Sequence, residues 1–351
     1  MRKIPTLIFT LALVACSQTH SQTSETSAKQ AVPNIFASPQ VPRSWDYRIA
    51  KVLTSSASQV VSQDAWNATS VSVTSLHNLG KPVLCYFSAG TWEYDNFSRL
   101  NINKVLTNGS GNVSEAQAVS TAIQNGKTSY TFGGQTRQLT GDQITFRNLA
   151  GSQLPGWDEY VYRIGGFTAS SSTAEHVLLR RIMNEHMQRM KTLGCDAIEP
   201  DNIDAYANVS GISATDQYNY NVWLASTAHN LGLKILLKND LGQISDGAED
   251  VPAGKPGLAR IYDGIINEEC FKYQECGEMK PFKDLNKPIF VREYLVQSCS
   301  TFKSGKYSST DSRSRQQVAS ALHLNVSGSQ YDNGGSPDAN ANPTTCGFGT
   351  W

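Results

Sequence analysis

Short apolar segments alternate with longer amphipathic segments over most of this chain, and the alternation limits the folds open to it. Strands are predicted at residues 60–64, 82–87, 196–199, 233–237, 262–267, 288–291 and 324–326, and helices at 72–79, 172–193, 214–230 and 313–323. Continuously apolar strands are buried on both faces, as in a parallel sheet covered by helices. The pattern therefore predicts the α/β class, as a (β/α)8 TIM-type barrel.

A doubly wound open sheet is the alternative arrangement of such units. Its nucleotide-binding forms carry a glycine-rich phosphate loop after the first strand, and no Gly-x-Gly-x-x-Gly or phosphate-loop motif follows the first predicted strand here. The length of 351 residues suits one barrel. We therefore assign residues 41–351 to a single barrel domain.

One stretch interrupts the alternation. Residues 101–143 are rich in Asn, Gly, Ser and Thr and are expected to form an inserted loop subdomain. A helix is predicted at 114–124, followed by a β-hairpin that turns at Gly133 and Gly134. Because the insertion follows the strand 82–87, it would overhang the functional face of a barrel. A decorative surface insertion is the alternative.

The N-terminus has the features of an export signal. Arg2 and Lys3 precede an apolar run, 4–15, of the length of a signal-peptide core. The run ends in Leu-Val-Ala before Cys16, which resembles a bacterial lipoprotein processing site; an ordinary signal peptide is the alternative. We expect a lipoprotein signal at 1–15, lipidation at Cys16, a flexible tether at 16–40, and a lipid-anchored protein at the outer membrane or cell surface.

Export makes disulfides permissible for the other six cysteines. Cys270 and Cys276 have no metal-ligand pattern around them, so a short-loop disulfide is favoured over a metal site. Cys299 and Cys346 lie in loop-rich sequence and are candidates to pair. Cys85 and Cys195 sit in apolar runs, where the role of small buried hydrophobic side chains is equally open.

Acidic residues gather where the predicted strands end: Glu93, Glu199, Asp201, Asp204, Asp240, Glu268, Glu269 and Glu293. Carboxyl ends of barrel strands form the face that carries active sites. Two facing carboxylates, one protonated and one ionised, perform glycosidic bond hydrolysis. For each acid taken singly, a salt bridge to a neighbouring Lys or Arg is the favoured role. The presence of the whole set at successive strand ends favours catalysis.

Other chemistries are less well supported. The chain has 30 basic and 30 acidic residues and no basic run, which argues against a nucleic-acid partner. His176, His186 and His229 lie on predicted helices and not at ligand spacing beside the acids, so neither a metal nor a cofactor is expected. A serine nucleophile is disfavoured because no Gly-x-Ser-x-Gly motif is present.

Four blocks carry a resemblance to a known family: residues 83–93 (VLCYFSAGTWE), 194–206 (GCDAIEPDNIDAY), 237–239 (LKN), and 267–271 (NEECF) followed by Cys276. They are similar to glycoside hydrolase family 114, the endo-α-1,4-polygalactosaminidases. The resemblance implies a barrel, Asp201 and Glu268 as catalytic carboxylates, and a Cys270–Cys276 disulfide that braces the loop beside Glu268. The 101–143 insertion is longer than the family leads us to expect, and the strand before Asp64 matches the family's acidic pattern only at Asp64.

Residues near these carboxylates are expected to bind substrate: Tyr86, Trp92, Glu93, Asn202, Asp204, Tyr206, Lys238, Asn239 and Glu293. The acids, with Asp240, would attract the ammonium groups of polygalactosamine. The aromatic side chains, with Trp157 and Tyr160, would stack on sugars or ammonium groups, core packing being the alternative for each. Lys238 is expected to hold one carboxylate ionised.

The predicted function is endo-acting hydrolysis of α-1,4-linked galactosamine polymers by two carboxylates, in a monomeric protein whose partners are the polysaccharide and, through the lipid, a membrane. A hydrolase of another α-linked glycan is one alternative. A non-catalytic, lipid-anchored glycan-binding protein is the other, and the presence of both Asp201 and Glu268 argues against it.

Overall fold

The computed structural model describes residues 31–39, 43–49, 51–93, 100–294, 296 and 298–328, with only the backbone described at 100, 101 and 328. Eight parallel strands form one sheet in the order β1-β2-β3-β9-β10-β11-β12-β13. They are β1 (Trp45–Arg48), β2 (Val60–Asp64), β3 (Val83–Ser88), β9 (Ala197–Asp201), β10 (Lys234–Lys238), β11 (Gly264–Glu268), β12 (Ile289–Glu293) and β13 (Leu324–Gly328). The predicted (β/α)8 barrel is confirmed.

The barrel is nearly closed at the seam between β13 and β1. These two edge strands lie beside each other, and the Arg43 backbone N–H next to β1 donates to Asn325 Oδ1 of β13 at 2.6 Å. The sequence analysis missed β1, a four-residue strand that alternates aromatic and charged side chains. Its burial comes from the barrel and is not visible in its composition.

Apolar side chains fill the lower part of the barrel: Ile35, Trp45, Tyr47, Val60, Leu84, Ala197, Leu236, Ile266 and Phe290. Successive residues of a strand point to opposite faces, so the residues two positions further along point into the barrel one layer higher. On β9, β10 and β12 these are Glu199, Lys238 and Arg292, all buried. The polar floor of the site therefore rests on an apolar plug.

The segment before β1 is part of this plug. Ile35 is 1% exposed and packs with Trp45 and Phe290 in the barrel interior. The prediction of a flexible tether up to residue 40 is therefore corrected, because at least residue 35 is packed into the fold. The signal peptide 1–15, Cys16 and the first half of the tether lie outside the described residues.

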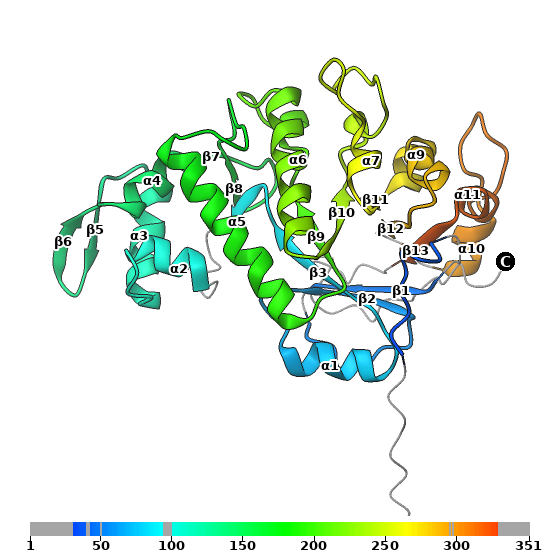
Figure 1. Ribbon diagram of the computed structural model, residues 1–351, viewed down its shortest axis with the longest axis horizontal. Coiled ribbons are helices and arrows are strands. Elements are labelled where there is room, and N and C mark those ends of the chain that lie inside the picture. The colour runs from blue at the N-terminus through cyan, green and yellow to red at the C-terminus, as the bar shows by residue number, and fades with distance from the viewer. Residues whose placement is uncertain are drawn as a thin grey trace, which may run out of the picture.

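Two long helices cover the first half of the barrel (Figure 1). They are α5 (Ala174–Leu193) and α6 (Ala214–Asn230), and α1 (Ser70–Asn78) links β2 to β3. The N-cap of α5 is Thr173, whose side chain accepts the His176 N–H, so the helix begins two residues after its predicted start at 172. The helix ends at Gly194, whose φ of 88° is left-handed and favours glycine.

Shorter helices connect the later strands. They are α7 (Leu258–Ile261), α8 (Cys270–Tyr273), α9 (Lys280–Asp284), α10 (Cys299–Ser304) and α11 (Arg315–Leu322). The helix α8 begins two residues after Glu268 at the end of β11, so it lies at the active-site face expected for a barrel.

An insertion between β3 and α5 extends to one side of the barrel, with a hairpin at its far end (Figure 1). The predicted helix and hairpin are present as α3 (Val113–Gln124), β5 (Ser129–Phe132) and β6 (Gln135–Gln138), beside α2 (Leu100–Leu106) and α4 (Asp142–Leu149). The insertion is larger than the predicted 101–143. An antiparallel sheet of β4 (Thr91–Glu93), β8 (Glu159–Tyr162) and β7 (Ala150–Gln153) joins it to the barrel.

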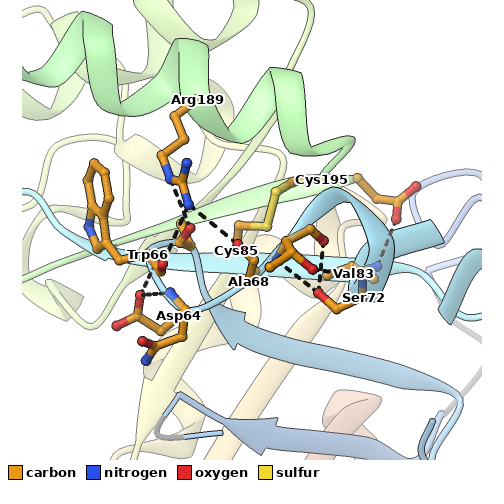
Figure 2. Close-up of a disulfide and its surroundings, with 12 residues drawn as sticks. Asp64, Trp66, Ala68, Ser72, Val83, Cys85, Arg189 and Cys195 are labelled. Carbon is orange, nitrogen blue, oxygen red and sulfur yellow. Dashed lines mark hydrogen bonds between the residues drawn. A yellow bond between two sulfur atoms is a disulfide. The ribbon is translucent and has the colours of Figure 1, made fainter. Parts of the chain in front are cut away.

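A disulfide closes the chain around this insertion. Cys85 in β3 is bonded to Cys195 beyond α5, 110 residues later, which resolves the alternatives left open by the sequence. Figure 2 shows the bond beside Arg189 of α5, which donates to the backbone oxygens of Ala65, Trp66 and Ala68 at 3.2–3.4 Å. The helix is thus fixed to the barrel by both a covalent bond and hydrogen bonds. Cys346, the proposed partner of Cys299, lies outside the described residues.

Candidate active site

A cavity of about 920 Å³ opens at the carboxyl ends of the barrel strands. It is lined by side chains from loops after β1, β3, β9, β10, β11 and β12 and from the insertion. Seven of the residues predicted to form the site line it: Tyr86, Asp201, Asn202, Asp204, Tyr206, Asn239 and Glu268.

Asp201 and Glu268 converge on one buried ammonium group. Asp201 ends β9, Glu268 ends β11, and Lys238 ends β10 between them. Lys238 Nζ lies 3.5 Å from Asp201 Oδ1 and 3.3 Å from Glu268 Oε1. The lysine side chain is 1% exposed, so it contacts the pair from below while both carboxylates reach the cavity.

A third carboxylate holds the same lysine from the barrel interior. Glu199 Oε1 accepts from Lys238 Nζ at 3.0 Å, and the Glu199 side chain is fully buried. Burial raises the pKa of Glu199 to about 7, although Lys238 acts against the rise. Burial alone would lower the pKa of Lys238, but Asp201, Glu268 and Glu199 raise it well above the ordinary value. Lys238 therefore stays charged.

Glu268 is held in its ionised form. The Tyr294 hydroxyl donates to Glu268 Oε1 at 2.5 Å and the Asn239 amide donates to Oε2 at 3.4 Å. Burial of the carboxyl acts to raise its pKa, but Lys238 and these two donors outweigh burial and lower it. Asn239 Oδ1 also accepts the Glu268 backbone N–H at 2.9 Å, which fixes the strand end. Asp201, in turn, accepts from the Tyr86 hydroxyl at 2.9 Å.

Two further acids beside the pair have perturbed titrations. The pKa of Asp204 rises to about 6 through burial and through repulsion by Asp201. The pKa of Asp240 rises well above its usual range, first through burial and then through Asp204. Asp240 accepts from the Asn221 amide at 2.8 Å through Oδ2, and its buried Oδ1 has no hydrogen-bond partner among the described residues. Both carboxyl groups on this side of the cavity therefore keep their protons to a higher pH than an exposed aspartic acid does.

The backbone at the strand ends is held in an unusual conformation. Asn202, Asn239, Asp240 and Glu269 follow β9, β10 and β11 and have left-handed φ values between 45° and 60°. Such conformations cost free energy and persist where surrounding contacts determine them. At Gly90 the space itself demands glycine, because an added Cβ would lie 1.6 Å from the backbone oxygen of Asn202.

The conformation of Asn202 ties the insertion to the site. Its amide Nδ2 lies within 3.0–3.2 Å of Ser88 Oγ, Thr91 Oγ1 and Glu159 Oε2. Thr91 and Glu159 belong to β4 and β8 of the insertion sheet and are hydrogen-bonded to each other. The residue that follows Asp201 is therefore positioned by the insertion as well as by the barrel.

A family model for glycoside-hydrolase family GH114 matches this chain over residues 25–120 and 113–328. The chain belongs to family GH114. It is a glycoside hydrolase. No curated protein matches the chain.

Two solved structures are similar to this GH114 hydrolase, and the first of them supports its fold. The crystal structure of Aspergillus fumigatus Ega3 in complex with galactosamine has a TM-score of 0.53 and 21% identity, over 83% of this chain and 92% of that chain. The glycoside hydrolase domain of PelA from Pseudomonas aeruginosa gives a TM-score of 0.48 and 12% identity, over 86% and 97% of the two chains.

Four residues predicted to bind substrate in this GH114 hydrolase do not line the cavity: Trp92, Glu93, Glu293 and Lys238. Trp92 is 2% exposed and packs edge-on against Phe146 of the insertion, so it is a core residue. Glu293 is also buried and accepts the Phe271 N–H at 3.0 Å, because it lies on the opposite face of β12 from Arg292. Glu93 ends the edge strand β4 and is absent from the lining residues described.

Lys238, the fourth of these residues, is 1% exposed beneath the cavity of the GH114 hydrolase, so the prediction that it binds substrate is corrected. Its ammonium acts instead on the carboxylates, and it lowers the pKa of Glu268. Tyr47 and Tyr294 are lining residues that the sequence analysis missed. Tyr47 sits on the missed strand β1. Tyr294 follows Glu293 directly, and the alternation of side chains along β12 was the signal that could have found it.

The predicted Cys270–Cys276 disulfide is present in the GH114 hydrolase, with Cys270 two residues after Glu268. Among the described residues, no group of three or more His, Cys, Asp or Glu side chains is arranged to hold a metal ion. In the same part of the chain, no helix has both the length and the apolarity needed to cross a membrane.

Proposed function

We propose that this protein hydrolyses α-1,4-linked galactosamine polymers at internal linkages, with Asp201 and Glu268 as the two catalytic carboxylates. The observation that carries the proposal is their convergence on Lys238, at 3.5 Å and 3.3 Å, at the bottom of the cavity. A cation shared by two acids lowers their mutual repulsion and fixes their geometry. The GH114 match supports the reaction class.

The separation of the two acids favours a retaining mechanism. Retaining glycosidases hold their carboxyl groups about 5–5.5 Å apart and inverting ones roughly 6.5–9.5 Å apart. Asp201 Oδ1 and Glu268 Oε1 both contact one nitrogen, at 3.5 Å and 3.3 Å, and so lie below most of the inverting range. In the first step one carboxyl gives its proton to the leaving glycosidic oxygen while the other bonds to the anomeric carbon. Water then breaks that carbon–oxygen bond, and the first group takes the water's proton.

The charge of the cavity favours a cationic polymer. Glu159, Asp204, Glu269 and Glu275 line it together with the proposed pair, whereas Asp240, with its strongly raised pKa, adds less negative charge. None of the described lining residues is Lys, Arg or His. Galactosamine units without an acetyl group carry an ammonium, which such a surface attracts. The galactosamine bound to the similar Ega3 structure agrees with this substrate class.

Exposed aromatic side chains support binding of a chain longer than the cleaved unit. Trp157, in the insertion loop between β7 and β8, is 55% exposed, and Tyr273 in α8 is 61% exposed. Both line the cavity, whereas most aromatic side chains in the described part of the chain are buried. Rings at the rim can stack on sugar faces on either side of the cleaved bond. We therefore expect cleavage within oligomers and slow release of single sugars.

The decisive experiment compares the wild type with Asp201→Asn and Glu268→Gln on galactosamine oligomers of defined length. Each variant should lose roughly 10²- to 10⁴-fold or more in rate while keeping its fold, because the replacements are nearly isosteric. Wild-type-like activity in both variants would refute the assignment, and Asp204 and Glu269 would be tested next. Oligomer binding by the wild type without cleavage would support the glycan-binding alternative.

The preference for a positively charged substrate is tested by varying the salt concentration. Hydrolysis of the de-acetylated polymer should weaken as ionic strength rises, because charges exposed to solvent are screened over about 10 Å at 0.1 M salt. Fully acetylated polymer of the same length should respond much less. Equal responses would show that the cavity does not select ammonium groups and would favour another α-linked glycan.

We also propose that the protein is exported, lipid-anchored through Cys16 at the bacterial envelope, and monomeric. The support is the basic start, the apolar run 4–15, and the Ser-, Thr- and Gln-rich sequence after Cys16. Two disulfides in the described part of the chain agree with an oxidising compartment.

A further inference from the structure

Glu199 is a carboxyl group with no access to substrate and an incomplete set of partners. It is 0% exposed, one layer below Asp201 on β9. Its Oε1 accepts from Lys238 at 3.0 Å, while its buried Oε2 has no hydrogen-bond partner among the described residues. A fully buried carboxylate is costly unless paired and hydrogen-bonded. For Glu199, no hydrogen bond to Oε2 offsets the cost of burying that oxygen.

The surroundings of Glu199 contain one ammonium for three carboxyl groups. Lys238 of β10 contacts Glu199 at 3.0 Å, Asp201 at 3.5 Å and Glu268 of β11 at 3.3 Å. The other groups that face this layer are Tyr86 of β3, in register with Glu199, and Tyr47 of β1, whose hydroxyl accepts from Lys238 at 3.3 Å.

Neither tyrosine ionises in the working pH range, and the second nearby cation, Arg292, interacts with other residues. Burial raises the pKa of Tyr47 and of Tyr86 well above the ordinary value. Arg292 of β12 packs over the Tyr47 ring at 5.2 Å and donates to Ser327 Oγ at 3.0 Å. Glu199 is therefore the group in this layer that can change its charge. A change in its charge alters how strongly the Lys238 ammonium attracts Asp201 and Glu268.

We propose that Glu199 is a positioning residue that sets how strongly Lys238 acts on Asp201 and Glu268. The inference rests on the proposed function of that pair. When Glu199 is neutral, the full charge of Lys238 serves the two acids at the cavity. When Glu199 is ionised, it takes a share of that charge and adds its own repulsion, so the acids above it hold a proton more strongly.

The sign of the effect follows from where Glu199 titrates. Because burial raises its pKa to about 7, Glu199 is protonated throughout the acid limb of a pH–activity profile and ionises only on the alkaline side. The alkaline limb of kcat/KM reports loss of the proton that the donor must give to the leaving oxygen. Ionised Glu199 delays that loss and extends activity to higher pH.

The test is the pH profile of Glu199→Gln, which keeps the shape of the side chain and removes its charge. The alkaline limb should move to lower pH by about one unit, and the apparent pKa of the acid limb should stay at the wild-type value. Asp263→Asn is the matched control. Asp263, which directly precedes β11, accepts a hydrogen bond from Lys234 Nζ at 2.8 Å. Lys234 begins β10, at the opposite end of the strand from Lys238, so the loss of Asp263 should move neither limb.

An unmoved alkaline limb in Glu199→Gln overturns the proposal, and so does an equal shift of both limbs, which would indicate a general disturbance of the site. If the variant folds poorly above pH 7, it is purified at pH 6, where Gln resembles the protonated Glu, and assayed after a rapid pH jump.

A second measurement needs no substrate and separates this proposal from the proposed function. With carboxyl carbons labelled by ¹³C, the NMR signals of Asp201 and Glu268 in the wild type should show an inflection near pH 7 that is lost in Glu199→Gln. The Asp201→Asn and Glu268→Gln variants assign the signals. An inflection in a protein that cleaves no polymer refutes only the proposed function, whereas its absence refutes the role of Glu199.

Discussion

Removal of the Cys85–Cys195 disulfide should destabilise the fold strongly and leave the chemistry of the site in place. The bond closes a loop with a sequence separation of 110, which contains the insertion and α5. In the chain-entropy model a loop of this length contributes about 4.7 kcal/mol to the free energy of unfolding. The Cys270–Cys276 bond, with a separation of 6, contributes only about 2 kcal/mol in the same model.

Only the Cys270–Cys276 bond should matter for activity. Neither Cys85 nor Cys195 lines the cavity, so Cys85→Ala/Cys195→Ala should retain its kcat at temperatures where it is folded. Cys270 begins the helix that follows Glu268 and Glu269. Loss of its bond should loosen that strand end, and misplacement of a reacting group by about 1 Å costs up to roughly 10²-fold in rate.

Urea unfolding of the oxidised wild type and of the two double variants measures the free energy of unfolding of each protein. Unfolding is monitored by tryptophan fluorescence and by circular dichroism, and the two transitions must coincide. Reduction of the wild type under the same conditions separates loss of the bonds from loss of the buried sulfur atoms. If the 270/276 variant lost more stability than the 85/195 variant, the argument from loop length would be wrong.

Three further outcomes are expected. Gly90→Ala should lower kcat by about 10²-fold, measured on galactosamine oligomers, because its Cβ would displace the Asn202 backbone next to Asp201; full activity would contradict the packing argument. The pKa of Glu199 is about 7 in the folded protein and roughly 4.5 in the unfolded chain, which contributes about 3 kcal/mol to the free energy of unfolding. This contribution is complete below pH 4.5 and is lost as the pH rises to 7. Urea unfolding at a series of pH values should show the decrease in the wild type and not in Glu199→Gln. Cys16→Ser should move the protein out of the membrane fraction, and an unchanged distribution would refute lipid anchoring.

The sequence placed a set of acids at one face because of a property of parallel barrels, and the resemblance to family 114 singled out Asp201 and Glu268 among them. Every strand delivers its last residues to the same face, so Asp201 and Glu268 could be placed together without knowing which strands are neighbours. Their convergence on Lys238 required the order β9-β10-β11, and consecutive strands of a barrel supply that order. The repeated pattern was therefore sufficient to bring the acids to one face, but it did not choose this pair among them.

The errors came from features that the pattern does not encode. Which face of a strand points into the barrel depends on register, and Glu268 is in register with Arg292, so Arg292 points inward and the neighbouring Glu293 points outward. The sequence offered Glu293 only as an acid at a strand end. Trp92 and Ile35 were misjudged for another reason, since their burial comes from partners distant along the chain.

The insertion has a structural role that its composition concealed. Its sheet approaches the barrel at Asn202, which bonds to Thr91 and Glu159 of the insertion and to Ser88 of β3. The same insertion supplies Trp157 at the cavity rim. A segment that merely decorated the surface would not share hydrogen bonds with the residue after Asp201. The Cys85–Cys195 bond closes the loop that carries the partners of Asn202, so the stability of the insertion and the placement of Asp201 are coupled through Asn202.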